Sequence, residues 1–468
     1  MAVSKRYRPY NPTQSYLLPP SPLEWLPEGH LARFVLSTVA ELDLSAIYGH
    51  YEAELRGFPP HHPKMMVGLL LYAYCVGVPS SRKIETKTHE DVAFRVISGD
   101  QHPDHTRISE FRRVHLEALA QLFTQVLEMC CRAGLVKLGH VALDGTKMKA
   151  NASKRKAMSF ERLEKEEQRL RDRVDALLKE AEEVDAAEDA LYGDKRGDEL
   201  PPELCDEKKR LEFIRRCLAE MRAEASTAVA EHKTPRQLKR ERENAKKRGD
   251  GPPPPPTATA GQLELPSHKI RIKARAPHPK AQRNFTDADS RIMKSSADGF
   301  IQGYNAQAAV DDGHQIVVAH ALTNQPPDVE HFVPMLHLIR QNLGRKPKKM
   351  TADSGYWSEM NVKAARRLKI EPYIATERSK HHEVPSAPRG PIPNGKKRDI
   401  RYLMKRKLAT VAGRLVYRKR MMTVEPVFGQ IKEARGFRRF LLRGLAKVRG
   451  EWALITTGHN LLKLHAAS

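Results

Sequence analysis

The chain has 468 residues and an ordinary apolar content, so it is long enough to form two or three folded domains. Its formal net charge of +24 and isoelectric point near 9.8 favour a polyanionic partner, of which nucleic acid is the commonest. The alternative at this point is a solvated, highly charged surface, or non-specific binding of the kind seen in ribosomal proteins.

The cysteine spacing and the hydropathy of the chain indicate in which cellular compartment the protein is expected. Five cysteines form no CxxC pair, which argues against a disulfide framework or a structural zinc site and fits a reducing cytoplasm. The first ten residues lack the apolar region of a signal peptide, and the longest apolar run, 65–78, is too short to span a bilayer. We therefore expect a cytoplasmic protein with no membrane segment.

Residues 1–135 are predicted to be mostly helical. Apolar residues recur at helical spacing over 30–44, Pro63 opens a run that continues to residue 76, and the helical period returns over 107–133. Short helices joined by tight turns are typical of helix-turn-helix DNA-binding domains, although a plain helical bundle has the same pattern. We favour a DNA-binding domain in this region.

Residues 154–266 have the composition of an insertion, rich in Glu, Lys, Arg and Ala and almost without aromatics. Two stretches separated by residues 192–202 predict an antiparallel coiled-coil hairpin, with a structural or oligomer-forming role. A basic run, 236–248, and a polyproline linker, 252–256, follow. The seven-residue apolar repeat is carried by Leu163, Leu170, Val174, Leu177, Ala181 and Val184, and then by Leu204, Leu211, Ile214, Leu218, Met221 and Ala225.

On both sides of this insertion the pattern changes to that of an α/β domain. The order of elements predicts an α/β (α+β) fold with a mixed sheet, formed by residues 136–153 and 267–468. Strands are expected at 138–145, 304–310, 315–321, 349–353 and 371–375, a hairpin turn at 311–313, and helices at 328–343 and 361–368.

Two carboxylates stand out because each follows a short apolar strand and precedes small residues. Asp144 ends the predicted strand 138–145, and Asp353 ends the strand that begins at residue 349. Functional groups converge at the carboxyl edge of open α/β sheets, and a buried carboxylate there is costly unless a cation neutralises it. The two aspartates are therefore candidate metal ligands.

Glu425 is the third candidate. It lies between Thr423, which can cap a helix, and Pro426, which suits a first helical turn, so we expect Glu425 to open a helix and point toward the sheet. Lys432 lies seven residues further, almost two turns, and is expected on the same face.

The C-terminal part of the chain carries most of the charge. Between Lys396 and Arg449 there are 18 Lys and Arg against 3 acidic residues. Phenylalanines and leucines interleave the cations near residue 440, which favours a surface for the DNA backbone over a merely solvated face. That surface is predicted to include Arg435, Arg438 and Arg439, with Arg443 and Lys447.

Several blocks of sequence resemble the DDE transposases of bacterial insertion sequences. The likeness covers most of the chain, although four residues separate Arg420 from Glu425 where the glutamate signature commonly has three. The blocks are Pro59-Pro60-His61-His62-Pro63, His105 to Phe111, Val141 to Asn151, Asp289 to Met293, Gly303 to Gln307, Thr351 to Trp357, and Tyr417 to Lys432.

The resemblance implies an RNase H-like catalytic domain, a helical N-terminal domain and metal-dependent chemistry. Asp144, Asp353 and Glu425 would hold two Mg²⁺ or Mn²⁺ ions, which suit an oxygen-only ligand set. Residues implied to contact DNA near the cut are Tyr417, Arg420, Lys432, Asn305 and Trp357, although Trp357 suits core packing equally well. Asp287, Asp289 and Asp328 either support the site or cap local turns.

The activity implied is cleavage of double-stranded DNA at the terminal inverted repeats of an element, followed by strand transfer into target DNA. Action on two DNA ends makes a homodimer or a larger assembly the expected form. Two alternatives stay open at this stage: an RNase H-like nuclease without strand transfer, and a non-catalytic DNA-binding repressor derived from a transposase.

Overall fold

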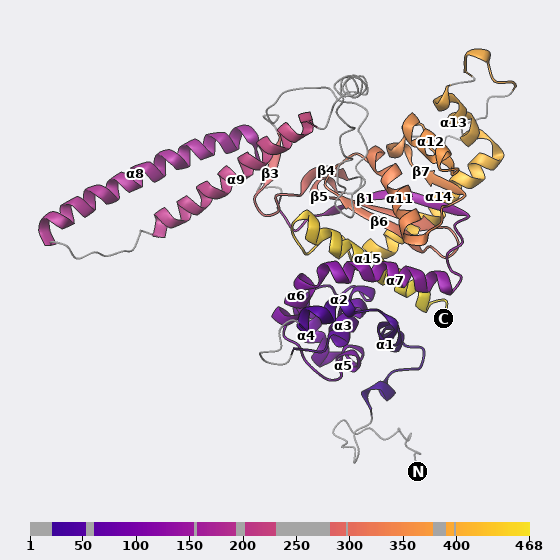
Figure 1. The fold of residues 1–468 in the computed structure, drawn as a ribbon, viewed down its shortest axis with the longest axis horizontal. Coiled ribbons are helices and arrows are strands. Elements are labelled where there is room, and N and C mark those ends of the chain that lie inside the picture. Colours follow the sequence, from indigo (N-terminus) through magenta and orange to yellow (C-terminus); the bar gives the residue numbers. More distant parts are fainter. Residues whose placement is uncertain are drawn as a thin grey trace, which may run out of the picture. The chain divides into compact units, whose positions relative to one another are not determined.

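The computed structural model describes residues 21–52, 60–153, 157–192, 202–230, 281–295, 298–377, 390–396 and 399–468 (Figure 1). The chain divides into two compact units, one formed by Met1–Met129 with Leu454–Ser468 and the other by Cys130–Ala453. We expected the whole of 267–468 to belong to one domain, whereas the residues from Leu454 onward group with the N-terminal unit. The predicted basic run 236–248 and polyproline linker 252–256 lie outside the described residues.

The first unit is helical, as the periodicity of its sequence predicts. One predicted helix, 107–133, is divided at His115, which ends α6, and α7 starts at the next residue. Its elements are η1 (Pro22–Trp25), α1 (Leu31–Glu41), α2 (Ser45–Glu52), α3 (Pro63–Cys75), α4 (Ser81–Glu90), α5 (Val92–Ser98), α6 (His105–Val114), most of α7 (Leu116–Arg132) and the end of α15 (Leu445–His465).

Helix α3 forms the centre of this unit. Pro63 occupies its first turn, where a missing backbone N–H costs nothing, and the His62 side chain accepts a hydrogen bond from the Lys64 amide at 3.2 Å. Nearly every residue of α3 from Met66 to Cys75 is buried. A helix that is apolar all round is packed on all its sides, and α3 is therefore the core helix of this unit.

The second unit is built on a mixed sheet with the strand order β4-β5-β1-β7-β8, and β6 also pairs with β5. β1 is antiparallel to β5 and parallel to β7, while β4 and β6 are antiparallel to β5 and β8 is parallel to β7. The strands are β1 (His140–Lys149), β4 (Arg291–Ser295), β5 (Gly299–Asp311), β6 (Val317–Thr323), β7 (Lys349–Ala352) and β8 (Glu371–Ile374).

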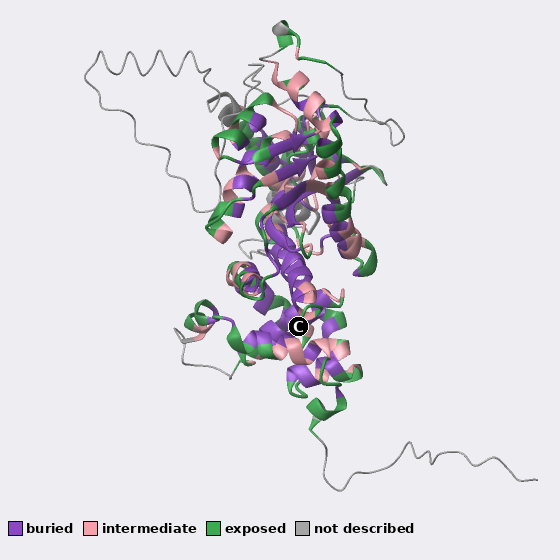
Figure 2. Cartoon of the chain, turned by 90° about the vertical axis from the view of Figure 1, so that its right-hand side faces the viewer, coloured by how far each residue is buried: buried purple, intermediate pink, exposed green. Residues whose placement is uncertain are grey.

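The central strands are buried on both faces, largely by apolar side chains. Val141, Ala142 and Leu143 of β1 are fully buried, and β5 is buried along almost its whole length. Figure 2 shows strands of the sheet in the colour of buried residues. Near-continuous apolar runs are what strands covered on both faces require. β5 extends five residues further toward the N-terminus than predicted, because Gly299 to Gly303 also pairs with β4.

Helices cover the two faces of this sheet. α11 packs on β6 and on α12, whereas α14 packs on β1, β5, β7 and β8. In α15, Trp452 is fully buried and donates to the Gln307 carbonyl oxygen at 3.2 Å. The helices in this unit are η3 (Val329–His331), α11 (Phe332–Leu343), η4 (Ser354–Tyr356), α12 (Glu359–Arg367), η5 (Asn394–Lys396), α13 (Ile400–Ala409), α14 (Val411–Gly429), the π-helical η6 (Gln430–Ala434) and the start of α15.

The predicted hairpin is formed by α8 (Phe160–Tyr192) and α9 (Pro202–Ala230), two long helices that Figure 1 shows in magenta. Cross-helix ion pairs join Glu164 to Arg222 at 2.9 Å and Arg173 to Glu207 at 2.8 Å. The earlier residue of α8 pairs with the later residue of α9, so the two helices run antiparallel. The heptad residues Leu163, Leu170, Ile214 and Leu218 are buried between the helices. At its base, β2 (Ala157–Ser159) pairs with β3 (Gln282–Asn284), so the segment leaves and rejoins the unit through one short ribbon.

None of the helices in the described part of the chain is both long enough and apolar enough to cross a membrane.

The hairpin depends on its apolar seam, which gives a first prediction. Ile214→Asp places an unpaired carboxylate at a fully buried position, at a cost of several kcal/mol, and should separate α8 from α9. We expect hydrogen exchange to become fast throughout both helices while the strands stay protected. Ala219→Asp adds the same charge to an exposed position of α9 and should leave exchange unchanged. Equal protection of the hairpin in both variants would contradict a packed seam.

Candidate active site

Asp144 is placed by the central strand β1. It lies opposite Ala308 of β5, one residue beyond the last pair that β1 makes with β7, Leu143 with Ala352. The predicted end of the strand at residue 145 is wrong, because β1 continues to Lys149. Asp144 is therefore in mid-strand, at the point where the parallel pairing stops and the two strands separate.

Asp353 directly follows β7 and lies next to Asp144 in register, since Leu143 pairs with Ala352. Its Oδ1 accepts the amide of Gly355 at 2.9 Å and so caps the short helix η4. The two aspartates, 209 positions apart in sequence, are neighbours because their strands are adjacent and parallel.

Glu425 does not open a helix, contrary to the prediction. It lies far inside α14, with Pro426 in the helix interior and Thr423 Oγ1 donating to the Lys419 carbonyl at 2.7 Å instead of capping a terminus. A proline there leaves the carbonyl of residue 422 without its helical donor. Gln315 supplies the replacement, because its side-chain amide donates to the Met422 oxygen at 3.0 Å.

Arg420 connects the third carboxylate to the first. One terminal guanidinium nitrogen donates to Asp144 Oδ2 at 2.7 Å, and the other donates to Glu425 Oε1 at 3.0 Å. The Arg420 side chain is 14% exposed, Asp144 18% and Glu425 45%. Tyr417, one turn earlier on α14, hydrogen-bonds to Arg420, and burial raises the pKa of its hydroxyl. The predicted residues of α14 therefore converge on Asp144.

Lys432 lies beside β1 rather than on the Glu425 face of a continuous α-helix, because the chain passes from α14 into the π-helical η6. Its Nζ donates to Thr146 Oγ1 at 2.5 Å and to the Lys147 carbonyl at 3.2 Å. Thr146 is two positions after Asp144 and on the same side of the strand. Burial lowers the pKa of Lys432.

The electrostatics of the site are those of crowded, buried acids. Burial raises the pKa of Asp144 to about 6, against the pull of Arg420 and with the help of the nearby Asp353 and Asp328 charges. Burial also raises the pKa of Asp353, and Asp328 adds to that effect. A cluster of buried acids stabilises an added cation, because each negative charge raises the free energy of ionising its neighbours.

The donor set fits a divalent metal ion of the magnesium class. Asp144, Asp353 and Glu425 offer only oxygen atoms, which magnesium and manganese prefer. The Arg420 guanidinium lies between two of these carboxylates, and its buried Nε has no hydrogen-bond partner among the residues that the structure describes. The three carboxylates are not drawn together to ligand spacing while Arg420 bridges two of them.

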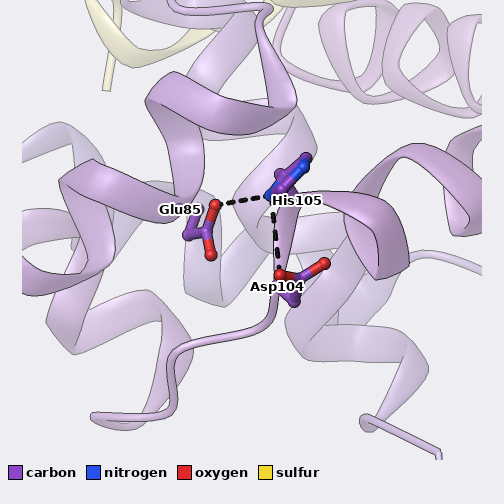
Figure 3. Close-up of side chains that lie close together, drawn as sticks. All are labelled: Glu85, Asp104 and His105. Carbon is purple, nitrogen blue, oxygen red and sulfur yellow. Dashed lines mark hydrogen bonds and ion pairs between the residues drawn. The ribbon is translucent and has the colours of Figure 1, made fainter.

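Over the described ranges, one group of acidic and histidine residues does have its ligand atoms within 4.8 Å of one another, and it lies in the other unit. His105 Nδ1 is 2.9 Å from Glu85 Oε2 and 3.5 Å from Asp104 Oδ2 (Figure 3). Asp104 caps α6 by accepting the Thr106 amide at 2.7 Å. These contacts join α4 to the start of α6, which accounts for the group without a metal ion.

The remaining predicted DNA contacts divide by burial. Asn305 is fully buried and donates to Asp328 at 2.6 Å, so it has no surface to offer to DNA. Arg435 is 8% exposed and lies over the Phe437 ring, which also removes it from the surface. Arg438 and Arg439 are exposed, and Arg438 pairs with Glu433. Trp357 is half-buried after η4.

Three residues of the site were not predicted: Lys147, Gln307 and Tyr356. The Tyr356 hydroxyl donates to Gln307 Oε1, and burial raises the pKa of Tyr356, with further contributions from Asp144 and Asp328. Lys147 Nζ is 3.0 Å from Asp328 Oδ1. All three lie inside the motif blocks quoted in the sequence analysis, and their place in those blocks was the signal that could have identified them.

The mixed sheet, with Asp144 and Asp353 at the point where the parallel strands β1 and β7 separate, is the arrangement expected of an RNase H-like fold. Comparison with known families agrees: residues 272–461 match the transposase DDE domain and residues 21–114 match a transposase domain (DUF772). The chain belongs to the DDE transposases of insertion sequences. Asp353 and Glu425 fall within the first match, and Asp144 precedes it.

No curated protein and no solved structure matches the chain.

The raised pKa of Asp144 predicts a pH-dependent penalty in the metal-free protein. Because the pKa of about 6 lies above the ordinary 3.8, folding favours the protonated acid, and stability falls as the pH rises from about 4 to 6. Asp144→Asn removes this penalty and keeps an oxygen for Arg420. A shift of about two units corresponds to about 3 kcal/mol.

We therefore expect the Asp144→Asn protein, measured by scanning calorimetry in chelator, to melt a few degrees above the wild type at pH 8 and close to it near pH 4. Asp298→Asn is the control of opposite sign, because the hydrogen bond from Lys149 lowers the pKa of that carboxyl. It should give no gain at pH 8. A lower melting temperature for Asp144→Asn at pH 8 would show that the ionised Asp144 carboxylate does not destabilise the folded protein.

Proposed function

We propose that this transposase hydrolyses phosphodiesters at the terminal inverted repeats of its element and then joins the exposed DNA ends to target DNA. The observation that supports the proposal is that Asp144 and Asp353 lie side by side where β1 and β7 separate, while Arg420 joins Asp144 to Glu425. It would act in the cytoplasm, as a dimer or larger assembly that holds two ends.

The three carboxylates would hold Mg²⁺ or Mn²⁺, which supplies charge stabilisation at the oxygens that attack and leave phosphorus. In the first reaction the water oxygen bonds to phosphorus and the P–O3′ bond breaks, which leaves a 3′-hydroxyl. In the second reaction that 3′-oxygen bonds to a target phosphorus and a target 3′-hydroxyl leaves. Both reactions are in-line displacements, so one site serves both.

The cations around the carboxylates would bind the DNA backbone. Arg420 presents a planar guanidinium that can grip a phosphate through two N–H groups, and Lys432 presents a point charge beside β1. Tyr417 would position Arg420, and Trp357 would contact the strand next to Asp353. If Asp144 and Glu425 held metal ions, the Arg420 guanidinium could exchange its carboxylate partners for a phosphate.

The remaining regions receive complementary roles. We assign DNA binding to the helical region 1–135 and catalysis to 136–153 with 267–468. The inserted region 154–266, with its α8–α9 hairpin, is assigned to assembly. Arg438 and Arg439, which are exposed near the end of β1, would extend the contact with the DNA backbone.

The role of Asp353 is tested with Asp353→Asn. DNA binding in chelator should stay within about twofold of the wild type, whereas nicking of repeat-bearing DNA in Mg²⁺ should fall about a thousandfold, the equivalent of several kcal/mol of charge stabilisation. Glu359→Gln neutralises an exposed acid at the start of nearby α12 and should keep full activity. Normal nicking by Asp353→Asn would remove that residue from the mechanism.

The same assay separates the alternatives for the wild type. Nicking followed by joining to a second DNA supports transposition. Nicking without joining identifies a nuclease, and specific binding without nicking identifies a repressor.

The backbone surface is tested by replacing Arg438 and Arg439 together with Gln. Binding should weaken on every DNA sequence, and the slope of log K against log salt should fall by about 2, one for each lost phosphate contact. Arg366 and Arg367, an exposed adjacent pair on α12, provide a matched control with the same charge loss. An equal change of slope in both double variants would show a general charge effect instead of a contact.

A further inference from the structure

Behind the catalytic strand lies a layer of polar side chains that the proposed chemistry does not use. Side chains alternate along a strand, so Gly145 and Lys147 face away from the side occupied by Asp144. Their direct partners on β5 are Gln307 and Asn305, which therefore share that opposite face. Both amide side chains are fully buried.

The carboxylate of Asp328 is the common acceptor of this layer. Its Oδ1 accepts from Asn305 Nδ2 at 2.6 Å, from Gln307 Nε2 at 2.9 Å and from Lys147 Nζ at 3.0 Å. The Lys147 and Asp328 side chains are only 16% and 20% exposed. This ion pair is largely shielded from water, and its carboxylate also accepts from two amide groups, so its geometry is well defined. Loss of the Asp328 carboxylate would leave its three donors without this acceptor.

Asp328 also accounts for two glycines of the catalytic motifs. A Cβ added to Gly145 would lie 2.8 Å from Asp328 Oδ1 and 2.4 Å from Gln307 Nε2. A Cβ added to Gly355 would lie 3.3 Å from Asp328 Oδ2 and 3.1 Å from Asp353 Oδ1. Neither glycine has a positive φ. Gly145 is needed for the close approach of Gln307 and Asp328, and a side chain at Gly355 would crowd the Asp353 and Asp328 carboxylates; turn geometry requires neither glycine.

The layer ties together the two backbone segments that carry the aspartates. Lys147 and Gly145 belong to β1 with Asp144, while Gly355 and Tyr356 belong to η4, which Asp353 caps. The Tyr356 hydroxyl bonds to Gln307 Oε1, and Gln307 Nε2 bonds to Asp328. Movement of either segment would therefore disturb the same carboxylate.

We propose that Asp328 is a positioning residue of the active site: through Lys147, Asn305 and Gln307 it fixes the relative placement of Asp144 and Asp353 for metal binding. It acts from the opposite face of β1 and touches neither DNA nor metal. The inference rests on the proposed function, because the quantity that it affects is the affinity of the carboxylate site for a divalent ion.

The test is the binding of Mn²⁺ alone to the purified full chain, measured by calorimetry without DNA. Asp328→Asn keeps the shape of the side chain but leaves the Lys147 charge unpaired and turns a donor toward the other donors. We expect Mn²⁺ affinity to fall at least about tenfold, the usual effect of losing a residue that orients metal ligands. Circular dichroism and metal-free DNA binding should stay as in the wild type.

The chain offers a matched control in Asp312, which is 19% exposed and pairs with Lys419 at 2.8 Å. Asp312→Asn removes a lysine ion pair whose carboxylate is as buried as that of Asp328, near the start of β1 and away from Asp144, and it should bind Mn²⁺ within about twofold of the wild type. Asp328→Glu keeps the charge and should restore part of the affinity. If Asp328→Asn does not fold, Gly355→Ala, which crowds the Asp328 and Asp353 oxygens, is expected to weaken Mn²⁺ binding instead.

The outcomes are distinct. Wild-type affinity in a folded Asp328→Asn protein, or in Gly355→Ala, overturns the positioning role alone, and so does an equal loss in Asp312→Asn. Failure of the wild-type chain to bind Mn²⁺ at all overturns the proposed metal-dependent function and the positioning role with it. A selective loss in Asp328→Asn that Glu partly restores supports the inference.

Discussion

The double pairing of β1 is the constraint on which the rest of the second unit depends. β1 is antiparallel to β5 and parallel to β7, and its fully buried residues Val141 to Leu143 fix its register between them. A slip of one residue would send every side chain to the opposite face. The register therefore sets which face Asp144 shares with α14 and which face Lys147 shares with Asp328.

Charge is the second organising factor, because four carboxylates lie close to one edge of this sheet. Arg420 and Lys147 neutralise them from opposite faces, the first at Asp144 and Glu425 and the second at Asp328. The two cations differ in what they can do next. Arg420 holds a carboxylate that is nearly half exposed, so it can change partners, whereas Lys147 is largely buried against Asp328 and stays in place.

Local sequence patterns predicted the strands, the α8–α9 hairpin and the helical unit well. They failed where a residue distant in sequence provides a hydrogen bond or a close contact that changes the local structure. Thr423 and Pro426 indicated a helix start, yet α14 runs through them because Gln315, from the β5–β6 turn, bonds the carbonyl that the proline leaves free. Asp144-Gly145 indicated a strand end, yet the glycine makes room for Asp328 while β1 continues.

The sequence by itself determined the periodicities that form the elements and the concentration of cations near the C-terminus, and its motifs singled out the three acidic residues as candidates. Only the tertiary structure decided that Asn305 and Arg435 are buried, that Arg420 joins Asp144 to Glu425, and that Asp328 lies behind both aspartates. Each of these contacts joins residues whose distance is set by strand order and register. Those are properties of the packed sheet, and no local spacing encodes them.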